Sequence, residues 1–206
     1  LSLCDTNLEH IQPHQIDNTH NFLVDVCMAA KYEGTSLKGY HDKYKIHNPD
    51  SQLCTVLARS FADIGDIVRG RDLYFGNSKE KNRRENLENN LKEIFKNIYD
   101  DLTKDNDNAA LKTRYQHDAP DYYQLREDWW TENRETVWKA ITCDDDDNKL
   151  RDASYFRNTC NDDETLSYAI HKCRCKDENG KKPGKPKAGN VSIVPTYFDY
   201  VPQYLR

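Results

Sequence analysis

Two groups of basic residues could perform binding chemistry on a chain whose formal net charge is −5. The first group opens a charged segment and consists of Lys79, Lys81, Arg83 and Arg84. The second lies in a stretch broken by Pro and Gly and consists of Lys181, Lys182, Lys185 and Lys187. Lysines and arginines held close together attract a polyanion such as a sulfated polysaccharide, and salt weakens this attraction by screening the charges. Both groups are therefore candidate binding sites, and the first is the stronger candidate.

Each basic group also has an alternative interpretation. The first precedes an amphipathic helical pattern, where positive charge opposes the helix macrodipole, and this placement indicates a function. The alternative is a solvated helix face with scattered glutamate partners. The second group contains too much Pro and Gly for a helix, so it forms either a mobile loop or a polyanion-binding finger.

Cysteines give the chain a second kind of chemistry. Four of its seven cysteines crowd into a hydrophilic, turn-rich span that burial alone would not hold in shape, namely Cys143, Cys160, Cys173 and Cys175. Disulfides suit such a span. A zinc site is the weaker alternative, because only one residue separates Cys173 from Cys175. The four cysteines allow three pairings among themselves.

The remaining cysteines lie earlier in the chain. Cys4 is expected to pair either with Cys54 or with a cysteine upstream of this sequence. Cys27 lies on the apolar stripe of a predicted helix, which suits a buried thiol as well as a bridge. Because seven is an odd number, at least one cysteine stays unpaired or pairs outside this sequence.

Carboxylates in this sequence do not indicate a metal site or catalysis. Asp63 and Asp66 each have an arginine within a helical turn, and no third ligand accompanies them. The four aspartates at 144–147 lack the alternating ligands and glycine of a calcium loop, which indicates a solvated, variable loop. No nucleophile elbow, phosphate-binding glycine loop or dinucleotide fingerprint occurs either. We therefore expect no enzyme, no metal and no cofactor.

Composition bounds the fold and excludes some partners. The chain has 206 residues, of which 36% are hydrophobic and 32% charged, so its core must be narrow and its helices solvated on their outer faces. Thirteen tyrosines and three tryptophans add large apolar side chains with polar tips. The acidic balance argues against a nucleic-acid partner. No apolar run reaches the length of a membrane span, so direct membrane insertion is not expected.

The central element that must position these groups is a predicted helix ending at Gly70. Gly65 inside it indicates close approach by another element. Arg59 is expected to pair with Asp63, and Asp66 with Arg69. The buried stripe recurs at steps of three and four residues and consists of Leu53, Val56, Leu57, Phe61, Ile64 and Val68.

Three further helices are predicted. One begins at Asp17 or Asn18, carries Phe22 and Val26 inward, and loosens at Gly34 and Gly39 before a polar connection over 40–50. A second is amphipathic, with an apolar stripe made of Leu87, Leu91, Ile94, Phe95, Ile98 and Leu102.

The third of these helices runs from about Pro120 to Cys143. Its neighbouring residues Trp129 and Trp130 must face different elements, because successive residues on a helix lie about 100° apart. Beyond it, residues 165–171 are expected to form a short helical turn. Residues 197–206 are expected to enter a further helix.

Several segments carry a family resemblance in addition to these patterns. They are the central stretch 59–77, the helix before it at 24–34, the pair 127–130 and 137–143, the segment 172–175, and the segment 194–206. They include Glu-Asp-Trp-Trp, Val-Trp-Lys-Ala-Ile-Thr-Cys, Lys-Cys-Arg-Cys and Val-Pro-Thr-Tyr-Phe-Asp-Tyr-Val-Pro-Gln-Tyr-Leu-Arg. In this order they resemble the blocks of alpha-class Duffy-binding-like domains in the variant erythrocyte membrane protein 1 adhesins of malaria parasites.

The resemblance implies a mostly α fold, a bundle of long helices with a disulfide-stapled loop region. It implies one partial Duffy-binding-like domain over 1–206. The end of the first subdomain and the central helix would occupy 1–78. The second subdomain would occupy 79–206 and end at the entry to an absent third subdomain.

The resemblance also implies adhesion. An extracellular module of this family, part of a larger membrane-anchored protein on the infected red cell, binds host receptors or glycans in cytoadhesion and rosetting. Heparan-sulfate-like chains, blood-group sugars and antibodies are the implied partners. The alternative is a structural spacer and variable immune target, with receptor binding carried by a neighbouring domain. Binding of the isolated chain to cells or glycans would separate the two.

Overall fold

The chain folds as a mostly helical protein in the computed structural model, which describes residues 8, 11–47, 52–73, 78–104, 108–143, 150, 153, 155, 157–162, 165–169, 172–175 and 193–206. Its helices are α2 (Thr19–His47), α3 (Leu53–Arg69), α4 (Ser78–Leu102), α5 (Ala109–Arg114) and α6 (Tyr123–Ile141). The strands are β1 (Asn158–Asp162) and β2 (Thr165–Tyr168). Three short 3-10 turns complete the order, namely η1 (Pro13–Gln15), η2 (Phe198–Tyr200) and η3 (Gln203–Leu205).

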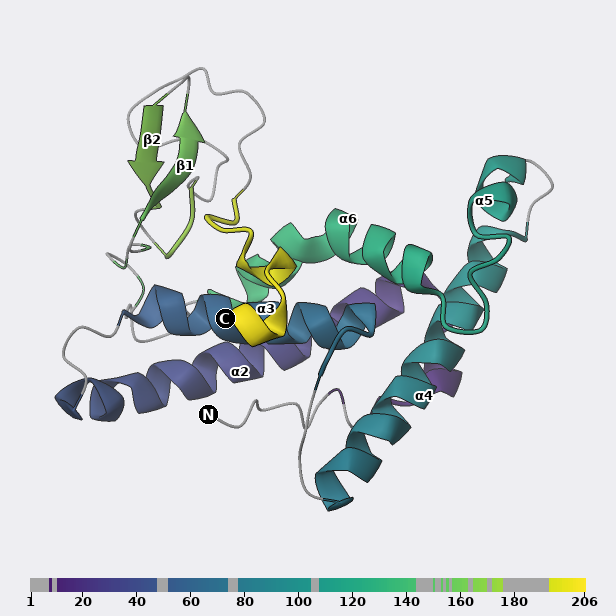
Figure 1. Ribbon diagram of the computed structural model, residues 1–206, viewed down its shortest axis with the longest axis horizontal. Coiled ribbons are helices and arrows are strands. Elements are labelled where there is room, and N and C mark those ends of the chain that lie inside the picture. Colours follow the sequence, from purple (N-terminus) through teal and green to yellow (C-terminus); the bar gives the residue numbers. More distant parts are fainter. Residues whose placement is uncertain are drawn as a thin grey trace.

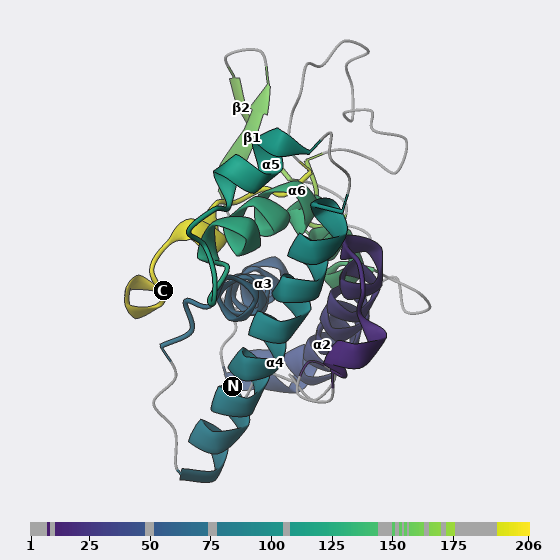
Figure 2. The same ribbon diagram turned by 90° about the vertical axis from the view of Figure 1, so that its right-hand side faces the viewer.

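Helices α2, α3 and α6 pack against one another as a bundle, and α4 runs obliquely past the end where α3 stops and α6 starts (Figures 1 and 2). The ring of Phe61 on α3 lies 5.1 Å from the rings of both Trp130 and Trp138 on α6. Both indoles are fully buried. The predicted mostly α bundle is therefore confirmed, with aromatic side chains at its centre.

The central helix α3 follows its prediction in its apolar stripe and its end. A Cβ at Gly65 would lie 2.7 Å from the Trp130 ring, which confirms that glycine permits a close approach there. Gly70 has φ +69° and ends the helix, as predicted. Asp66 pairs with Arg69 at 2.9 Å. The predicted Arg59–Asp63 pair is wrong, because Asp63 lies 3.4 Å from Arg206 instead and Arg59 is exposed to solvent.

Helix α2 is longer than predicted. Asn18 caps it by accepting backbone hydrogen bonds from His20 and Asn21, as expected. The predicted loosening at Gly34 and the polar connection over 40–50 are wrong as far as residue 47, because the helix continues to His47. A Cβ at Gly34 would lie 2.1 Å from the Ile141 carbonyl oxygen. Gly34 therefore allows the end of α6 to pack closely against α2, and it does not break the helix.

The two neighbouring tryptophans of α6 face different elements, as predicted. Trp129 packs on Phe22 of α2 at 4.6 Å and on Phe95 of α4 at 6.3 Å, whereas Trp130 faces α3. The predicted stripe of α4 is buried at Leu87, Leu91, Ile94, Phe95 and Ile98. Aromatic contacts thus fasten α4 to the bundle.

Beyond α6 the described residues form a small antiparallel hairpin of β1 and β2. The expected helical turn is wrong over 165–168, because backbone hydrogen bonds to β1 make this segment a strand. The last residues, 193–206, lie against α3 and α6, where they form η2 and η3 as short 3-10 turns.

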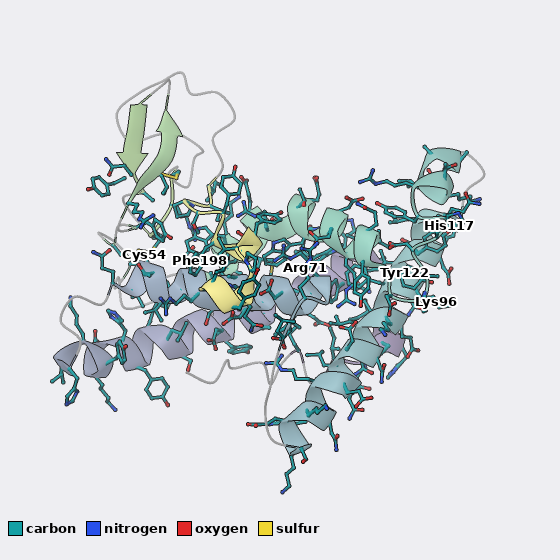
Figure 3. The ribbon with its side chains drawn as sticks, in the orientation of Figure 1. Cys54, Arg71, Lys96, His117, Tyr122 and Phe198 are labelled. Atoms are coloured by element: carbon teal, nitrogen blue, oxygen red, sulfur yellow. A yellow bond between two sulfur atoms is a disulfide. The ribbon has the colours of Figure 1, made fainter. Side chains whose placement is uncertain are left out.

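Two disulfides staple the region after α6. Cys160 joins Cys175 with their Cα atoms 5.4 Å apart, and Cys54 joins Cys173 with a Cα separation of 5.6 Å. The four late cysteines therefore do not pair only among themselves. The expected pairing of Cys4 with Cys54 is wrong, because Cys54 is bound to Cys173. Cys54 opens α3 on the side that faces the hairpin, which places it within reach of Cys173 (Figure 3). Cys143 takes part in neither bridge.

Candidate functional site

The strongest sequence candidate, the basic group at the start of α4, divides between two helix faces. Residues four apart share a face, so Lys79 and Arg83 lie together. Lys81 and Arg84 are three residues apart and lie on the other side of the helix, since Lys81 is rotated about 200° from Lys79. Lys79, Lys81 and Arg83 are exposed. These three cations are accessible to a ligand, although one flat ligand cannot touch them all.

Arg84 has a structural contact that the sequence did not indicate. Its Nε lies 3.6 Å from Asp72, and both side chains are only about a fifth exposed, at 20% and 18%. Asp72 also accepts a hydrogen bond from Gln203, and Gln203 in turn accepts one from the backbone N–H of Leu73. Arg84 therefore connects the start of α4 to the segment after α3 and to the C-terminal turns.

The other predicted site residues cannot be compared with the structure. Lys181, Lys182, Lys185 and Lys187 lie outside the described residues. Cys4 also lies outside them, as does the acidic block at 144–147, which is expected to be a solvated loop.

A cluster of buried charges lies between α3, α6 and the C-terminal turns, the part of the molecule in which Figure 3 labels Phe198. Asp199 is fully buried and accepts two hydrogen bonds from Arg134, at 2.8 and 2.7 Å. The indole N–H of Trp130 donates a third at 2.9 Å. Burial alone would lower the pKa of Arg134, but the hydrogen bonds and charge of Asp199 outweigh it and raise that pKa. Arg134 therefore stays charged inside the protein.

Arg69 extends this cluster from α3. It pairs with Asp66, donates to the backbone carbonyl of Asp199, and lies over the ring of Tyr200 at 4.9 Å. Burial lowers the pKa of Arg69 from its usual value, while Glu127 and Asp199 oppose that effect. Arg206 completes the group by contacting Asp66. Together these contacts fix residues 199–206 on the bundle.

A further buried arginine, on α6, closes the C-terminal end of α3. Arg126 is fully buried and donates to the carbonyls of Val68 and Ile67, at 2.6 and 3.1 Å. Its Nη1 and Nη2 also donate to Glu88 of α4, at 2.7 and 2.9 Å. This arginine supplies the donors that the last carbonyls of a helix lack, and it joins α3, α4 and α6.

Sequence reasoning missed both arginine clusters. The partners Arg134 and Asp199 are 65 residues apart, so no local spacing connects them. One usable signal was present, because Arg134 lies four residues from both Trp130 and Trp138, on the inward stripe of α6. A charged residue on a buried stripe requires a partner elsewhere.

These buried charge clusters suit the positioning of helices and turns more than catalysis. Among the described residues, no group of three or more His, Cys, Asp or Glu side chains could hold a metal ion. In the same part of the chain, no helix is long and apolar enough to cross a membrane.

Comparison with known proteins agrees with the sequence resemblance. The family model described as Duffy binding domain matches residues 1–206. The search of curated proteins finds no match. Among solved structures, the NTS-DBL1(alpha-1) domain of Plasmodium falciparum membrane protein 1 (PfEMP1), varO strain, is 38% identical with a TM-score of 0.68. The match covers 98% of this chain and 39% of that one, so this chain spans about two fifths of the solved relative.

Two further matches are DBLbeta domains of PfEMP1. One, from IT4var13 and bound to ICAM-1, is 27% identical with a TM-score of 0.58, over 98% of this chain and 40% of that one. The other, from PF11_0521 and bound to human ICAM-1, is 31% identical with a TM-score of 0.54, over 70% and 32%. With a family model that covers its whole length, this chain belongs to the Duffy binding domain family.

Proposed function

We propose that this chain is an extracellular adhesion module, and not an enzyme, of a variant parasite surface antigen. It binds a host cell-surface receptor or a sulfated, heparan-sulfate-like glycan. Its solved relatives belong to PfEMP1, and two of them are bound to the host protein ICAM-1. In the same proposal, the parent protein is membrane-anchored on the infected red cell. Rosetting, binding of blood-group sugars and antibody recognition would use the same exposed surface.

The observation that carries the glycan proposal is the placement of Lys79, Lys81 and Arg83. All three are exposed on the first two turns of α4, where positive charge opposes the helix macrodipole. Their position therefore costs helix stability, and attraction of a polyanion offers a reason for it. Arg84 is left out of this surface, since it pairs with Asp72. The second candidate surface consists of Lys181, Lys182, Lys185 and Lys187.

The test is retention of the oxidised chain on immobilised heparin across a salt gradient. The site variant carries Lys79→Ser, Lys81→Ser and Arg83→Ser. A matched control removes the same charge elsewhere, through Lys96→Ser, Lys104→Ser and Lys112→Ser. We expect only the site variant to elute at clearly lower salt, because its lost contacts are electrostatic.

Each other outcome has a definite meaning. The two variants could instead elute at the same salt concentration while both still bind heparin more strongly than an uncharged matrix. That result would move the glycan site to the lysines at 181–187. Failure of the unmodified chain to bind heparin at physiological salt would favour the spacer and immune-target alternative.

A further inference from the structure

The C-terminal end of α2 extends beyond the helices that cover the rest of it. Gly34 lies against the Ile141 carbonyl and Lys38 donates to the Cys143 carbonyl, so α6 ends level with this part of α2. Ser60 of α3 donates a hydrogen bond to Glu33 of α2. Helix α3 starts only seven residues before Ser60, at Leu53, so it extends about 10 Å from this contact along α2. The last buried residue of α2 is His41. Figure 1 shows the bluest turns of α2 projecting past the start of α3.

This projecting end, the α2 tip, consists of Gly39, Tyr40, His41, Asp42, Lys43, Tyr44, Lys45, Ile46 and His47. Three of its large apolar side chains are strongly exposed: Tyr40 by 65%, Tyr44 by 48% and Ile46 by 76%. Tyr40, Lys43, Tyr44 and His47 follow the spacing i, i+3, i+4, i+7 and share one face. At Gly39 an added Cβ would meet nothing within 4 Å, so the backbone itself can be approached.

Exposed apolar side chains are the distinctive feature of the α2 tip. Single exposed apolar residues are common on protein surfaces. Tyr40 and Tyr44 lie one turn apart and form an exposed apolar strip, and Ile46 exposes a further apolar side chain on another side of the projecting end. Exposed apolar patches mark interaction sites. Tyrosine is also enriched among the residues that dominate binding energy at protein interfaces.

We propose that the α2 tip docks a host protein whose apolar contact surface is bordered by carboxylates. The border follows from charge complementarity, since Lys43, Lys45 and His47 surround the apolar side chains and Asp42 is the one carboxylate of the tip. A sulfated glycan fits less well, because two lysines offset by one aspartate attract a polyanion weakly. The inference rests on the proposed adhesion function but not on the basic start of α4.

The test uses the full chain and intact human erythrocytes, either untreated, treated with trypsin to remove surface protein, or treated with heparinase to remove sulfated glycans. The tip variant carries Tyr40→Ser, Tyr44→Ser and Ile46→Ser. Its control on the same helix carries Val24→Ser and Met28→Ser, whose side chains are 61% and 42% exposed. Circular dichroism is used to check that both variants fold.

We expect cell binding that trypsin abolishes and heparinase spares. The tip variant should bind at least about tenfold more weakly, while the Val24/Met28 control binds normally. A variant with Lys43→Glu and Lys45→Glu should also lose binding. Unchanged binding by the tip variant, tip-dependent binding that heparinase removes, or absence of trypsin-sensitive binding would each overturn the inference.

The two proposals can fail separately. Loss of heparin retention by the site variant of α4, with trypsin-sensitive binding intact, supports both surfaces. If heparin does not retain the chain but cells bind it in a trypsin-sensitive, tip-dependent way, the α2 tip would remain as the adhesive surface and the glycan site would be refuted.

Discussion

The buried Asp199–Arg134 pair gives the sharpest test of how the C-terminal turns are held. Replacing Asp199 with Asn keeps the size of the side chain and removes its charge. Arg134, which is 7% exposed, would then lie buried without a counter-charge. Removing one partner of a buried pair typically costs about 3–5 kcal/mol, because the remaining charge stays desolvated. We expect Asp199→Asn to lower the free energy of unfolding by an amount in this range.

The chain offers a matched control for the same chemistry at the surface. Asp128 also accepts two hydrogen bonds from one arginine, Arg114, at 2.6 and 2.8 Å. These side chains are 31% and 51% exposed, so solvent screens the pair. Asp128→Asn should therefore cost no more than about 1 kcal/mol.

Urea unfolding followed by tryptophan fluorescence measures both costs, since Trp130 binds Asp199 directly. Adding Arg134→Met to Asp199→Asn removes the orphaned charge and should recover part of the loss. An Asp199→Asn variant as stable as Asp128→Asn would refute the argument that this pair fixes the C-terminal turns through a buried charge. A double variant less stable than the single one would also contradict it.

Four other predictions each concern a single position. Gly65→Ala should cost about 1–3 kcal/mol in urea unfolding, because its Cβ would lie 2.7 Å from an indole ring, whereas Gly39→Ala should stabilise by about 0.5–1 kcal/mol because its space is open. Burial raises the pKa of Cys27 from 9.0 to about 11, so iodoacetamide at pH 8 should alkylate it roughly a hundredfold more slowly than an ordinary thiol, as followed by mass spectrometry. Hydrogen bonds from Arg114 lower the pKa of Asp128 below 3.8. The ionised Asp128 therefore stabilises the fold above pH 3.8, and this contribution is lost as the pH falls through the lowered pKa. The urea midpoints of the unmodified chain and of Asp128→Asn should accordingly approach each other at that low pH.

Features that depend on periodicity or on a single special residue could be predicted from the sequence. The stripe of α4, the end of α3 at Gly70 and the divergent tryptophans of α6 all follow from helical geometry and local sterics. The role of Gly65 could be predicted too, because a glycine inside an apolar helix weakens it unless another element packs closely there.

Features that depend on contacts between distant segments were missed or mistaken. Gly34 resembles a helix breaker in sequence, yet it admits the end of α6, more than 100 residues later. The crowding of the late cysteines favours a local partner for Cys173, but the fold brings it to Cys54, which is 119 residues away. The polar and aromatic residues of the α2 tip lack an apolar stripe, and this pattern predicts a connection. The structure nonetheless keeps this end of α2 helical to His47.

The two proposed surfaces occupy places where the fold demands little of the side chains. The α2 tip extends past α3 and α6, and the exposed cations of α4 lie on turns before its first buried residue, Leu87. Stability instead comes from aromatic contacts and from buried arginines that join the helices. Substitutions at either surface should therefore change binding with little effect on folding. Arg84 is the exception next to the basic surface, because its loss would release Asp72 and the turns that it holds. A sequence comparison that treated the four basic residues at the start of α4 as one binding motif would thus combine a positioning residue with three candidate ligand contacts.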